Sequence, residues 1–190
     1  MELILASGSP RRREMFDLMG LRYTLRPSDA DEALSPCPPG EMVETLALRK
    51  AASVKKSAPG CCVVGADTIV YLDGRIIGKP ADEADASRIL RLLSGRTHTV
   101  YTGVAIVTDE KQIVFHETTD VTFASLTEAE IADYVASGEP MDKAGAYGVQ
   151  GIGAVLVARV EGCYFNVIGL PIPTFYRKLA ETGILPIWRS

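Results

Sequence analysis

The stretch LILASGSPRRR, residues 3–13, joins a short apolar run to a turn rich in arginine. Gly8 allows a tight backbone turn, Ser9 is a residue type that caps helices, and Pro10 suits the first helical position. Apolar residues then recur at helical spacing as far as residue 19. The stretch therefore predicts a buried strand that turns directly into a helix, as at the start of an α/β fold.

The same turn predicts a site for an anion. The first N–H groups of a helix have no partner within the helix and attract phosphate groups. Three arginines follow at 11–13, and the planar guanidinium group suits bidentate contacts to phosphate oxygens. A ligand with several phosphate oxygens is one interpretation. An ordinary strand-to-helix loop with solvated arginines is the other, and this stretch alone does not decide between them.

Length and composition restrict the possible classes of protein. A chain of 190 residues, with 47% hydrophobic and 23% charged residues, fits a soluble globular protein. We expect residues 1–190 to form a single domain. A net charge of -4 and a pI near 5.3 argue against nucleic-acid binding. Any phosphate binding must therefore be local.

Cysteine usage and the N-terminal run predict the cellular location. Cys37, Cys61, Cys62 and Cys163 show no C-x-x-C spacing, so we interpret them as reduced thiols. The first apolar run is too short for a signal peptide or a membrane span. We therefore expect a cytoplasmic protein with no membrane partner.

The rest of the chain predicts helices interspersed with strands and hairpins, which indicates an α/β fold with a mixed sheet. The predicted helices cover 42–56, 82–93, 127–135 and a segment after Pro171. The predicted strands are Arg22–Arg26; Cys62–Ala66, with Asp67 at its end; Thr68–Leu72 with Arg75–Ile77; His98–Val107 with Ile113–Ala124; and Ala154–Val160 with Tyr164–Ile168, the last three as hairpins.

Asp67 is the first candidate for chemistry because it lies between apolar residues. An unpaired buried carboxylate costs several kcal/mol or becomes protonated. A lysine, an arginine or a metal ion is therefore expected beside Asp67. The alternative is an Asp that accepts hydrogen bonds from backbone N–H groups of a loop.

Two lysines are candidate phosphate ligands. Lys79 lies between Gly78 and Pro80 on a short, stiff segment, and Lys50 lies in a predicted helix. Each could instead be a solvated surface lysine. The segment is no P-loop, because Pro80 stands where Ser or Thr is required.

Residues 141–153, MDKAGAYGVQGIG, are too rich in glycine for an ordinary helix. Glycine lets the backbone approach a flat ligand, Tyr147 could stack on it, and Gln150 has both a donor and an acceptor for a nucleobase edge. A plain glycine-rich turn is the alternative. His98 and His116 lie in strand-like runs without metal-ligand spacing, so we expect both to be structural.

Five sequence blocks together resemble the Maf family, in the family's order and almost from end to end. They are LASGSPRR (5–12), GADT (65–68), GKP (78–80), YTGV (101–104) and DKAGAYGVQG (142–151). The resemblance implies a Maf/Ham1-like (ITPase-like) fold, with a mixed twisted sheet flanked by helices and two lobes around a central cleft. It implies a nucleoside triphosphate pyrophosphatase that cleaves between the α- and β-phosphates with Mg²⁺ or Mn²⁺, and it implies a homodimer.

The resemblance also suggests a substrate class. One subgroup of the family prefers dTTP and UTP, another 7-methyl-GTP, and they differ at three motif positions. At these positions this sequence has Arg11, Thr68 and Gln150, and in this it resembles the dTTP/UTP subgroup. The amide of Gln150 can pair with O4 and N3–H of uracil or thymine, whereas a glutamate would favour guanine.

Roles for individual residues follow from the resemblance. Asp67 is expected to act as general base, and Glu32 and Asp67 are expected to hold the metal ion. A metal-bound carboxylate is a weaker base, so the two roles of Asp67 compete and both stay open. Asp29 and Asp31 lie beside Glu32, and the alternative for each of the three acids is a solvated side chain without a ligand. The expected triphosphate ligands are Ser7, Ser9, Arg11, Arg12, Lys50 and Lys79.

Two functions remain open at this stage. The first is hydrolysis of dTTP, UTP or modified pyrimidine nucleotides in a housecleaning role. The alternative is a nucleotide-sensing protein that regulates a partner, because the family has been linked to septum formation and cell division. Both would use the same phosphate site, and no sequence stripe identifies a dimer interface.

Overall fold

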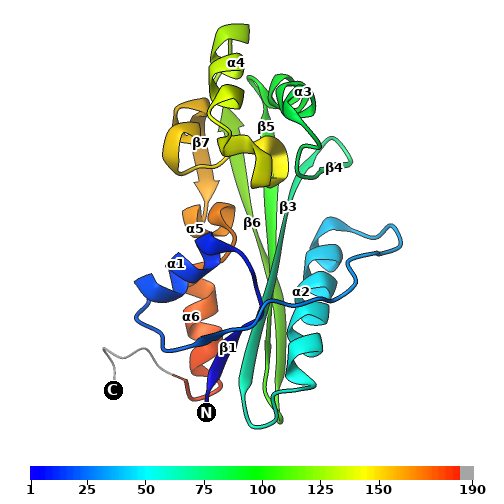
Figure 1. Ribbon diagram of the computed structural model, residues 1–190, viewed down its shortest axis with the longest axis vertical. Helices are drawn as coiled ribbons and strands as arrows, with labels where there is room; N and C mark the ends of the chain where they lie inside the picture. The colour runs from blue at the N-terminus through cyan, green and yellow to red at the C-terminus, as the bar shows by residue number, and fades with distance from the viewer. Residues whose placement is uncertain (185–190) are drawn as a thin grey trace. The chain divides into compact units, whose positions relative to one another are not determined.

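A computed structural model, which describes residues 1–184, has the mixed α/β architecture expected from the sequence (Figure 1). Seven strands form one sheet in the order β2-β1-β3-β5-β6-β7, with β4 paired to β3. The strands are β1 Leu3–Leu5, β2 Thr24–Leu25, β3 Cys62–Leu72, β4 Arg75–Ile77, β5 Thr97–Val107, β6 Gln112–Phe123 and β7 Val157–Gly162. The α-helices are α1 Pro10–Leu18, α2 Pro39–Lys55, α3 Glu83–Leu93, α4 Glu128–Ala136, α5 Tyr164–Ile168 and α6 Ile172–Ala180.

The chain divides into two compact units. The first unit contains Met1–Asp67, Thr102–Glu117 and the chain from Gly169 onward, and the second contains Thr68–Tyr101 and Thr118–Ile168. Strands β3, β5 and β6 contribute residues to both units. That residues 1–190 act as a single domain stays a prediction.

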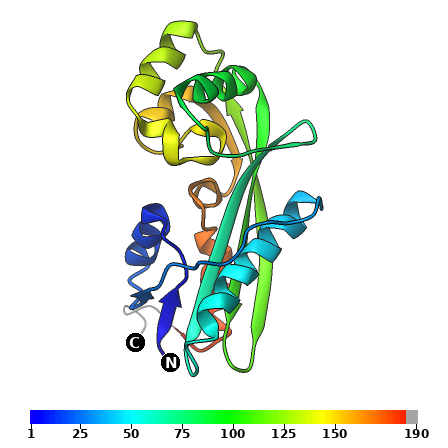
Figure 2. The same cartoon turned by 45° about the vertical axis from the view of Figure 1, so that its right-hand side comes forward.

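The first unit is built around β1, which is fully buried. Strand β1 pairs in parallel with β2 on one side and with β3 on the other, with Ile4 opposite both Thr24 and Val63. Helices α1 and α6 lie on one side of these strands and α2 lies on the other (Figures 1 and 2). The rings of Phe16 and Phe175 join α1 to α6, with their centroids 5.4 Å apart.

Helix α2 packs directly onto the backbone of two strands. A Cβ atom on Gly65 of β3 would lie 2.2 Å from the carbonyl oxygen of Ala47, and one on Gly103 of β5 would lie 2.3 Å from the carbonyl of Val43. Only glycine fits at such separations. The approach is close enough for Lys50 of α2 to reach Asp67 of β3.

The second unit has its own apolar core. Buried side chains of α3 and α4 pack with those of the strands, among them Leu90, Ile131 and Phe123. Both helices begin as the sequence predicts. Asp82 caps α3, and the side chains of Thr127 and Glu130 form a capping box at the start of α4.

Most predicted elements are confirmed. The five predicted helices correspond to α1, α2, α3, α4 and α6, and β3 pairs antiparallel with β4 as a hairpin. Strands β5 and β6 are neighbours joined by a short turn, in which the Thr108 N–H donates to the Lys111 carbonyl at 2.8 Å.

The prediction that a strand ends at Asp67 is wrong. Strand β3 runs without interruption from Cys62 to Leu72, so Asp67 lies in its middle. The strand continues because the residues after Asp67 are mostly buried and pair with β4, Val70 opposite Ile77.

The predicted hairpin of Ala154–Val160 with Tyr164–Ile168 is also wrong. Residues 151–156 form a 3₁₀ segment, and β7 pairs with β6 so that Glu161 lies opposite Asp120. Tyr164–Ile168 form the short helix α5. Its buried Asn166 donates to the Val100 carbonyl at 3.1 Å and to Thr119 Oγ1 at 3.0 Å, contacts that hold this segment as a helix against the strands.

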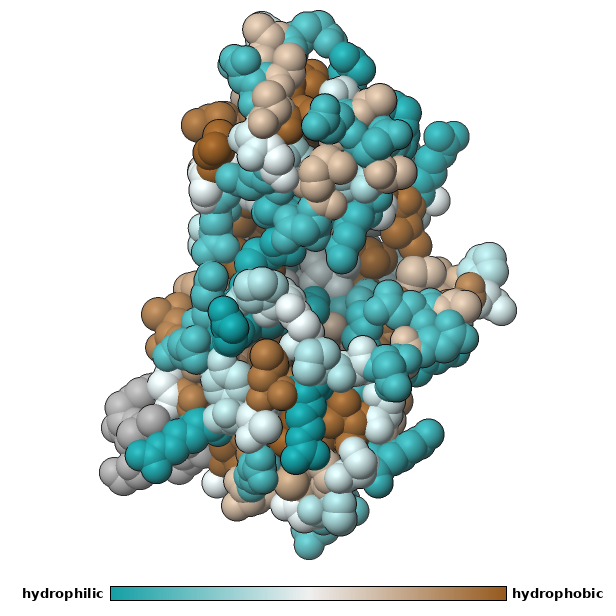
Figure 3. All heavy atoms as spheres, viewed as in Figure 1, coloured by the Kyte–Doolittle hydropathy of each residue, from teal (hydrophilic) through white to brown (hydrophobic). Residues whose placement is uncertain are grey.

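The surface mixes polar and apolar side chains. On the face drawn in Figure 3, hydrophilic side chains separate the exposed hydrophobic ones. Among residues 1–184, no helix has the length and apolar character needed to cross a membrane. All four cysteines are free thiols, as predicted.

Candidate functional site

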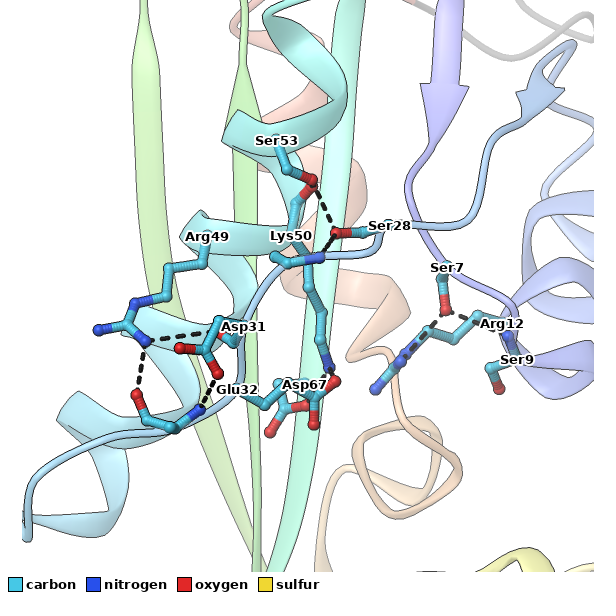
Figure 4. A network of polar contacts seen from close by, with 12 residues as sticks. Ser7, Ser9, Arg12, Ser28, Asp31, Glu32, Arg49, Lys50, Ser53 and Asp67 are labelled. Atoms are coloured by element: carbon cyan, nitrogen blue, oxygen red, sulfur yellow. Dashed lines mark hydrogen bonds and ion pairs between the residues drawn. The ribbon is translucent and has the colours of Figure 1, made fainter.

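The turn between β1 and α1 forms a compact polar cradle. Ser7, which is only 6% exposed, accepts hydrogen bonds at Oγ from the Ser9 N–H at 3.2 Å and from Arg12 Nη1 at 3.3 Å (Figure 4). Ser9 occupies the predicted N-cap position, but its side chain makes no capping hydrogen bond. Ser9 therefore stands at the N-cap position without capping the helix, and the hydrogen bonds of the turn are made to Ser7.

Arg12 is anchored from a distant part of the sequence. Its Nε donates at 2.8 Å to the carbonyl of Gly169, the residue that follows α5. Burial lowers the pKa of Arg12 from its ordinary value, while the negative charges of Asp67 and Glu32 act in the opposite direction and the positive charge of Arg11 adds to the lowering. Arginine remains charged at any physiological pH. The cradle therefore presents a fixed positive charge near two carboxylates.

Two carboxylates converge on one ammonium group. Lys50 of α2 donates from Nζ to Asp67 Oδ1 at 2.6 Å and lies 2.9 Å from Glu32 Oε1 (Figure 4). The side chain of Asp67 is 13% exposed, whereas that of Glu32 is 62% exposed. The sequence-based prediction that Asp67 needs a cationic partner is confirmed, and Lys50 is that partner.

The loop that carries Glu32 is held by side chains of α2. Arg49 Nη1 donates to the carbonyls on either side of Glu32, Ala33 at 2.7 Å and Asp31 at 3.3 Å. The carboxylate of Asp31 accepts from the Ala33 N–H at 2.9 Å, so it stabilises the loop itself. Of the candidate acids in this loop, Glu32 makes the ion pair with Lys50.

The site thus combines the cationic side chains of Arg12 and Lys50, two carboxylates and the start of α1, which also carries Arg11, within the first unit. Among residues 1–184, no group of three or more His, Cys, Asp or Glu side chains is arranged to hold a metal ion. A metal ion here would therefore have only the carboxylates of Glu32 and Asp67 as protein ligands of this kind.

Comparison with known proteins assigns the chain to a family. The family model described as Maf-like protein matches residues 2–182. The chain belongs to the Maf family. A dTTP/UTP pyrophosphatase of Bacillus mycoides (strain KBAB4) is 50% identical to this Maf chain over 181 residues, 95% of each chain. A dTTP/UTP pyrophosphatase of Bacillus thuringiensis subsp. konkukian (strain 97-27) is 48% identical over 184 residues, 96% of each chain.

Among solved structures, the Staphylococcus aureus Ham1 protein aligns with a TM-score of 0.49 and 17% identity, over 65% of the Maf chain and 72% of that chain. The family membership rests on the sequence comparisons and not on this alignment.

The predicted site residues of the Maf chain fall into two groups. Those in the first unit are Ser7, Ser9, Arg12, Glu32, Lys50 and Asp67, which lie in the cradle or at the ion pair (Figure 4), and Arg11, which lies in the first turn of α1. Those in the second unit are Thr68, Lys79 and Gln150. Lys79 and Gln150 are exposed, and Thr68 is half-buried in β3.

Tyr147 does not lie where a base could stack on it. Its ring is 5% exposed and packs edge-on against Phe123 and His98, with centroids 4.7 Å and 5.3 Å away. His98 Nε2 lies 2.7 Å from the Tyr147 hydroxyl, so His98 is structural as expected. Tyr147 braces the glycine-rich segment, and the stacking interpretation is wrong.

Sequence reasoning missed the residues that hold the Glu32 loop, the Arg12 side chain and the glycine-rich segment in place. Arg49 and Gly169 act through backbone carbonyls, which no side-chain pattern reveals. Glu139, which precedes the glycine-rich segment, accepts two of its backbone N–H groups. One signal could have indicated such an acceptor. A glycine-rich turn leaves backbone N–H groups without helical or strand partners, and these need hydrogen-bond acceptors from elsewhere.

Proposed function

We propose that this chain is a nucleoside triphosphate pyrophosphatase that hydrolyses dTTP and UTP to the nucleoside monophosphate and pyrophosphate. The observation that carries the proposal is the ion-pair cluster of the first unit, in which Asp67 and Glu32 share the ammonium group of Lys50. The names of the relatives support the substrate class. Modified pyrimidine nucleotides are further proposed substrates, in a housecleaning role.

The cradle would hold the triphosphate. Arg12 is fixed by Ser7 and Gly169, so its guanidinium group is already oriented before a ligand arrives. Such preorganised positive charge stabilises the transition state of phosphoryl chemistry without a reorganisation cost. Ser9 and Arg11 would add contacts from the same turn, and we propose Lys50 and Lys79 as the remaining phosphate ligands.

Asp67 would act as the general base. Its carboxylate is almost buried, and the hydrogen bond from Lys50 fixes its orientation at Oδ1. The other carboxylate oxygen would accept a proton from the water that attacks the α-phosphorus. Positioning and proton acceptance together are typical of enzymes that hydrolyse phosphoanhydrides.

A divalent cation fits the donor set. Mg²⁺ usually binds one or two carboxylates and completes its shell with water and substrate phosphate oxygens. Glu32 and Asp67 already converge on a cationic group, the ammonium of Lys50, and we propose them as the carboxylate ligands of Mg²⁺ or Mn²⁺. For Asp67 this role competes with that of general base, because a metal-bound carboxylate is a weaker base. When bound, the cation neutralises charge on the phosphate oxygens.

Substrate choice is proposed to depend on Arg11, Thr68 and Gln150. Gln150 is exposed in the glycine-rich segment, and its amide has the donor and acceptor that a uracil or thymine edge requires. We also propose a cytoplasmic location, which the four free thiols support, and a homodimer, as the family resemblance implies.

The test is pyrophosphate release from dTTP, UTP, CTP, GTP and 7-methyl-GTP in the presence of Mg²⁺ or Mn²⁺. We expect turnover of dTTP and UTP, loss of it in Asp67→Asn, and normal turnover in the control Asp133→Asn, which changes an exposed residue of α4. Tight nucleotide binding without turnover would reject the enzyme and favour the nucleotide-sensing alternative. Release of phosphate in place of pyrophosphate would reject the bond assignment.

A further inference from the structure

The carboxylate of Glu139 lies at the centre of the Gly148–Gly153 loop, the part of the glycine-rich segment that contains Gln150. Glu139 Oε1 accepts from the Gly153 N–H at 3.0 Å, and Oε2 accepts from the Ile152 N–H at 2.9 Å. The loop residues that follow Gln150 are therefore tied to one side chain from the preceding 3₁₀ turn, Glu139–Asp142.

Tyr134 of α4 ties down the other end of this loop. Its hydroxyl accepts from the Gly148 N–H at 3.2 Å and donates to Glu139 Oε1 at 3.0 Å. The ring is 2% exposed and packs in the core of the second unit. The loop is thereby tied to Tyr134 of α4 before Gln150 and to Glu139 after it.

The glycines show how tightly the loop surrounds these two side chains. A Cβ atom on Gly153 would lie 2.3 Å from the Gly148 carbonyl oxygen and 2.6 Å from the Tyr134 hydroxyl. One on Gly151, whose φ is +67°, would lie 2.7 Å from Glu139 Oε2. Gln150 therefore stands on a backbone with little freedom to move.

We propose that Glu139 and Tyr134 are positioning residues that hold Gln150 for recognition of the pyrimidine base. This inference rests on the function proposed above. Neither residue needs to touch the nucleotide, because both act through the backbone of the Gly148–Gly153 loop.

The chemistry of Glu139 explains why a glutamine would not replace it. Three donors, two backbone N–H groups and one hydroxyl, converge on its two oxygens. A carboxylate can accept all three, whereas a glutamine would place its NH₂ group against one of them. Burial raises the pKa of Glu139, but the hydrogen bonds that it accepts outweigh burial and lower the pKa overall, so the ionised form is the one present at neutral pH.

The experiment compares UTP with CTP, which have the same sugar and phosphates and differ only at the base edge. Dissociation constants of α,β-methylene-UTP and α,β-methylene-CTP are measured together with kcat and KM for UTP and CTP. For Glu139→Gln we expect the preference for the uracil compounds to fall roughly five- to tenfold, the size of one lost hydrogen bond. The change should lie in KM for UTP, with kcat little affected.

Two further variants identify the cause. The double variant Glu139→Gln/Gln150→Ala should show the selectivity of Gln150→Ala alone, because residues that act through one another are not additive. Tyr134→Phe keeps the ring in the core and removes the hydroxyl, so it should lower selectivity in the same direction. It also provides a second test in case Glu139→Gln does not fold.

The matched control is Glu130→Gln. Glu130 also accepts a backbone N–H, that of Thr127 at 2.7 Å, but belongs to the capping box of α4. It should leave selectivity unchanged. Equal losses for UTP and CTP, or additive effects in the double variant, would overturn the positioning role. Selective binding of the uracil analogue without pyrophosphate release would reject the proposed enzyme and leave the positioning role intact.

Discussion

The buried imidazole of His98 is expected to lower the stability of this protein in mild acid. Burial lowers the pKa of His98 from 6.5 to about 4, with a smaller opposing effect from the charge of Asp120. The side chain is 2% exposed, and its Nδ1 has no hydrogen-bond partner among the described residues. The folded protein therefore keeps His98 neutral in a pH range where the unfolded chain would protonate it.

The size of the effect follows from proton linkage. Below pH 6.5 the unfolded state binds a proton at His98 that the folded state does not bind until about pH 4. The free energy of unfolding therefore decreases as the pH falls through this window and stops changing below it. Between pH 7 and pH 5 the loss from this one group amounts to about 2 kcal/mol.

The assay is urea unfolding of the wild type and of His98→Gln at pH 7 and pH 5. The variant is expected to lose about 2 kcal/mol less than the wild type over this interval, whatever its stability at pH 7. His116→Gln serves as the control and leaves His98 as the sole histidine, since the sequence contains two. Its imidazole resonances then report the pKa directly by NMR. A measured pKa near 6.5, or equal losses in wild type and His98→Gln, would refute the reasoning.

Three further predictions test the fold and the site. Gly65→Ala should lower the free energy of unfolding by about 1–3 kcal/mol or more, measured in urea, because its Cβ would meet the Ala47 carbonyl at 2.2 Å. Arg49→Ala should raise the Mg²⁺ concentration at half-maximal turnover more than Arg49→Lys does, because it releases the loop that holds Glu32; an unchanged Mg²⁺ dependence would contradict this. Thr127→Ala should cost about 1 kcal/mol in thermal unfolding without changing turnover, since it removes only the capping box.

Local patterns were sufficient to predict much of the fold. The strand, turn and helix of residues 3–18 could be predicted because an apolar run is followed by residue types common at helix starts, although the side chain of Ser9 makes no capping hydrogen bond. Asp67 was misplaced because a polar pair after an apolar run looks like the end of a strand. The lysine that lets a carboxylate remain within β3 lies 17 residues away, and no local pattern contains it.

Short apolar runs were the second feature whose structure local sequence patterns did not predict. Tyr164–Ile168 are rich in the aromatic and β-branched residues that are common in strands, yet they form a helix in which Asn166 finds its partners on β5 and β6. In the candidate site, the need of Asp67 for a cation could be predicted from electrostatics alone. The hydrogen bonds of Arg49 and Glu139 could not be predicted, because their partners are backbone groups that come near these side chains only when the chain folds.

The two glycines beneath α2 also limit how the site can be altered. Spacing between a helix and a sheet is ordinarily set by side chains, and a change of one side chain can widen or narrow it. At Gly65 and Gly103 the helix backbone lies against the strands with only hydrogen atoms between them. Redesign of substrate choice should therefore leave these contacts unchanged and vary the loops instead.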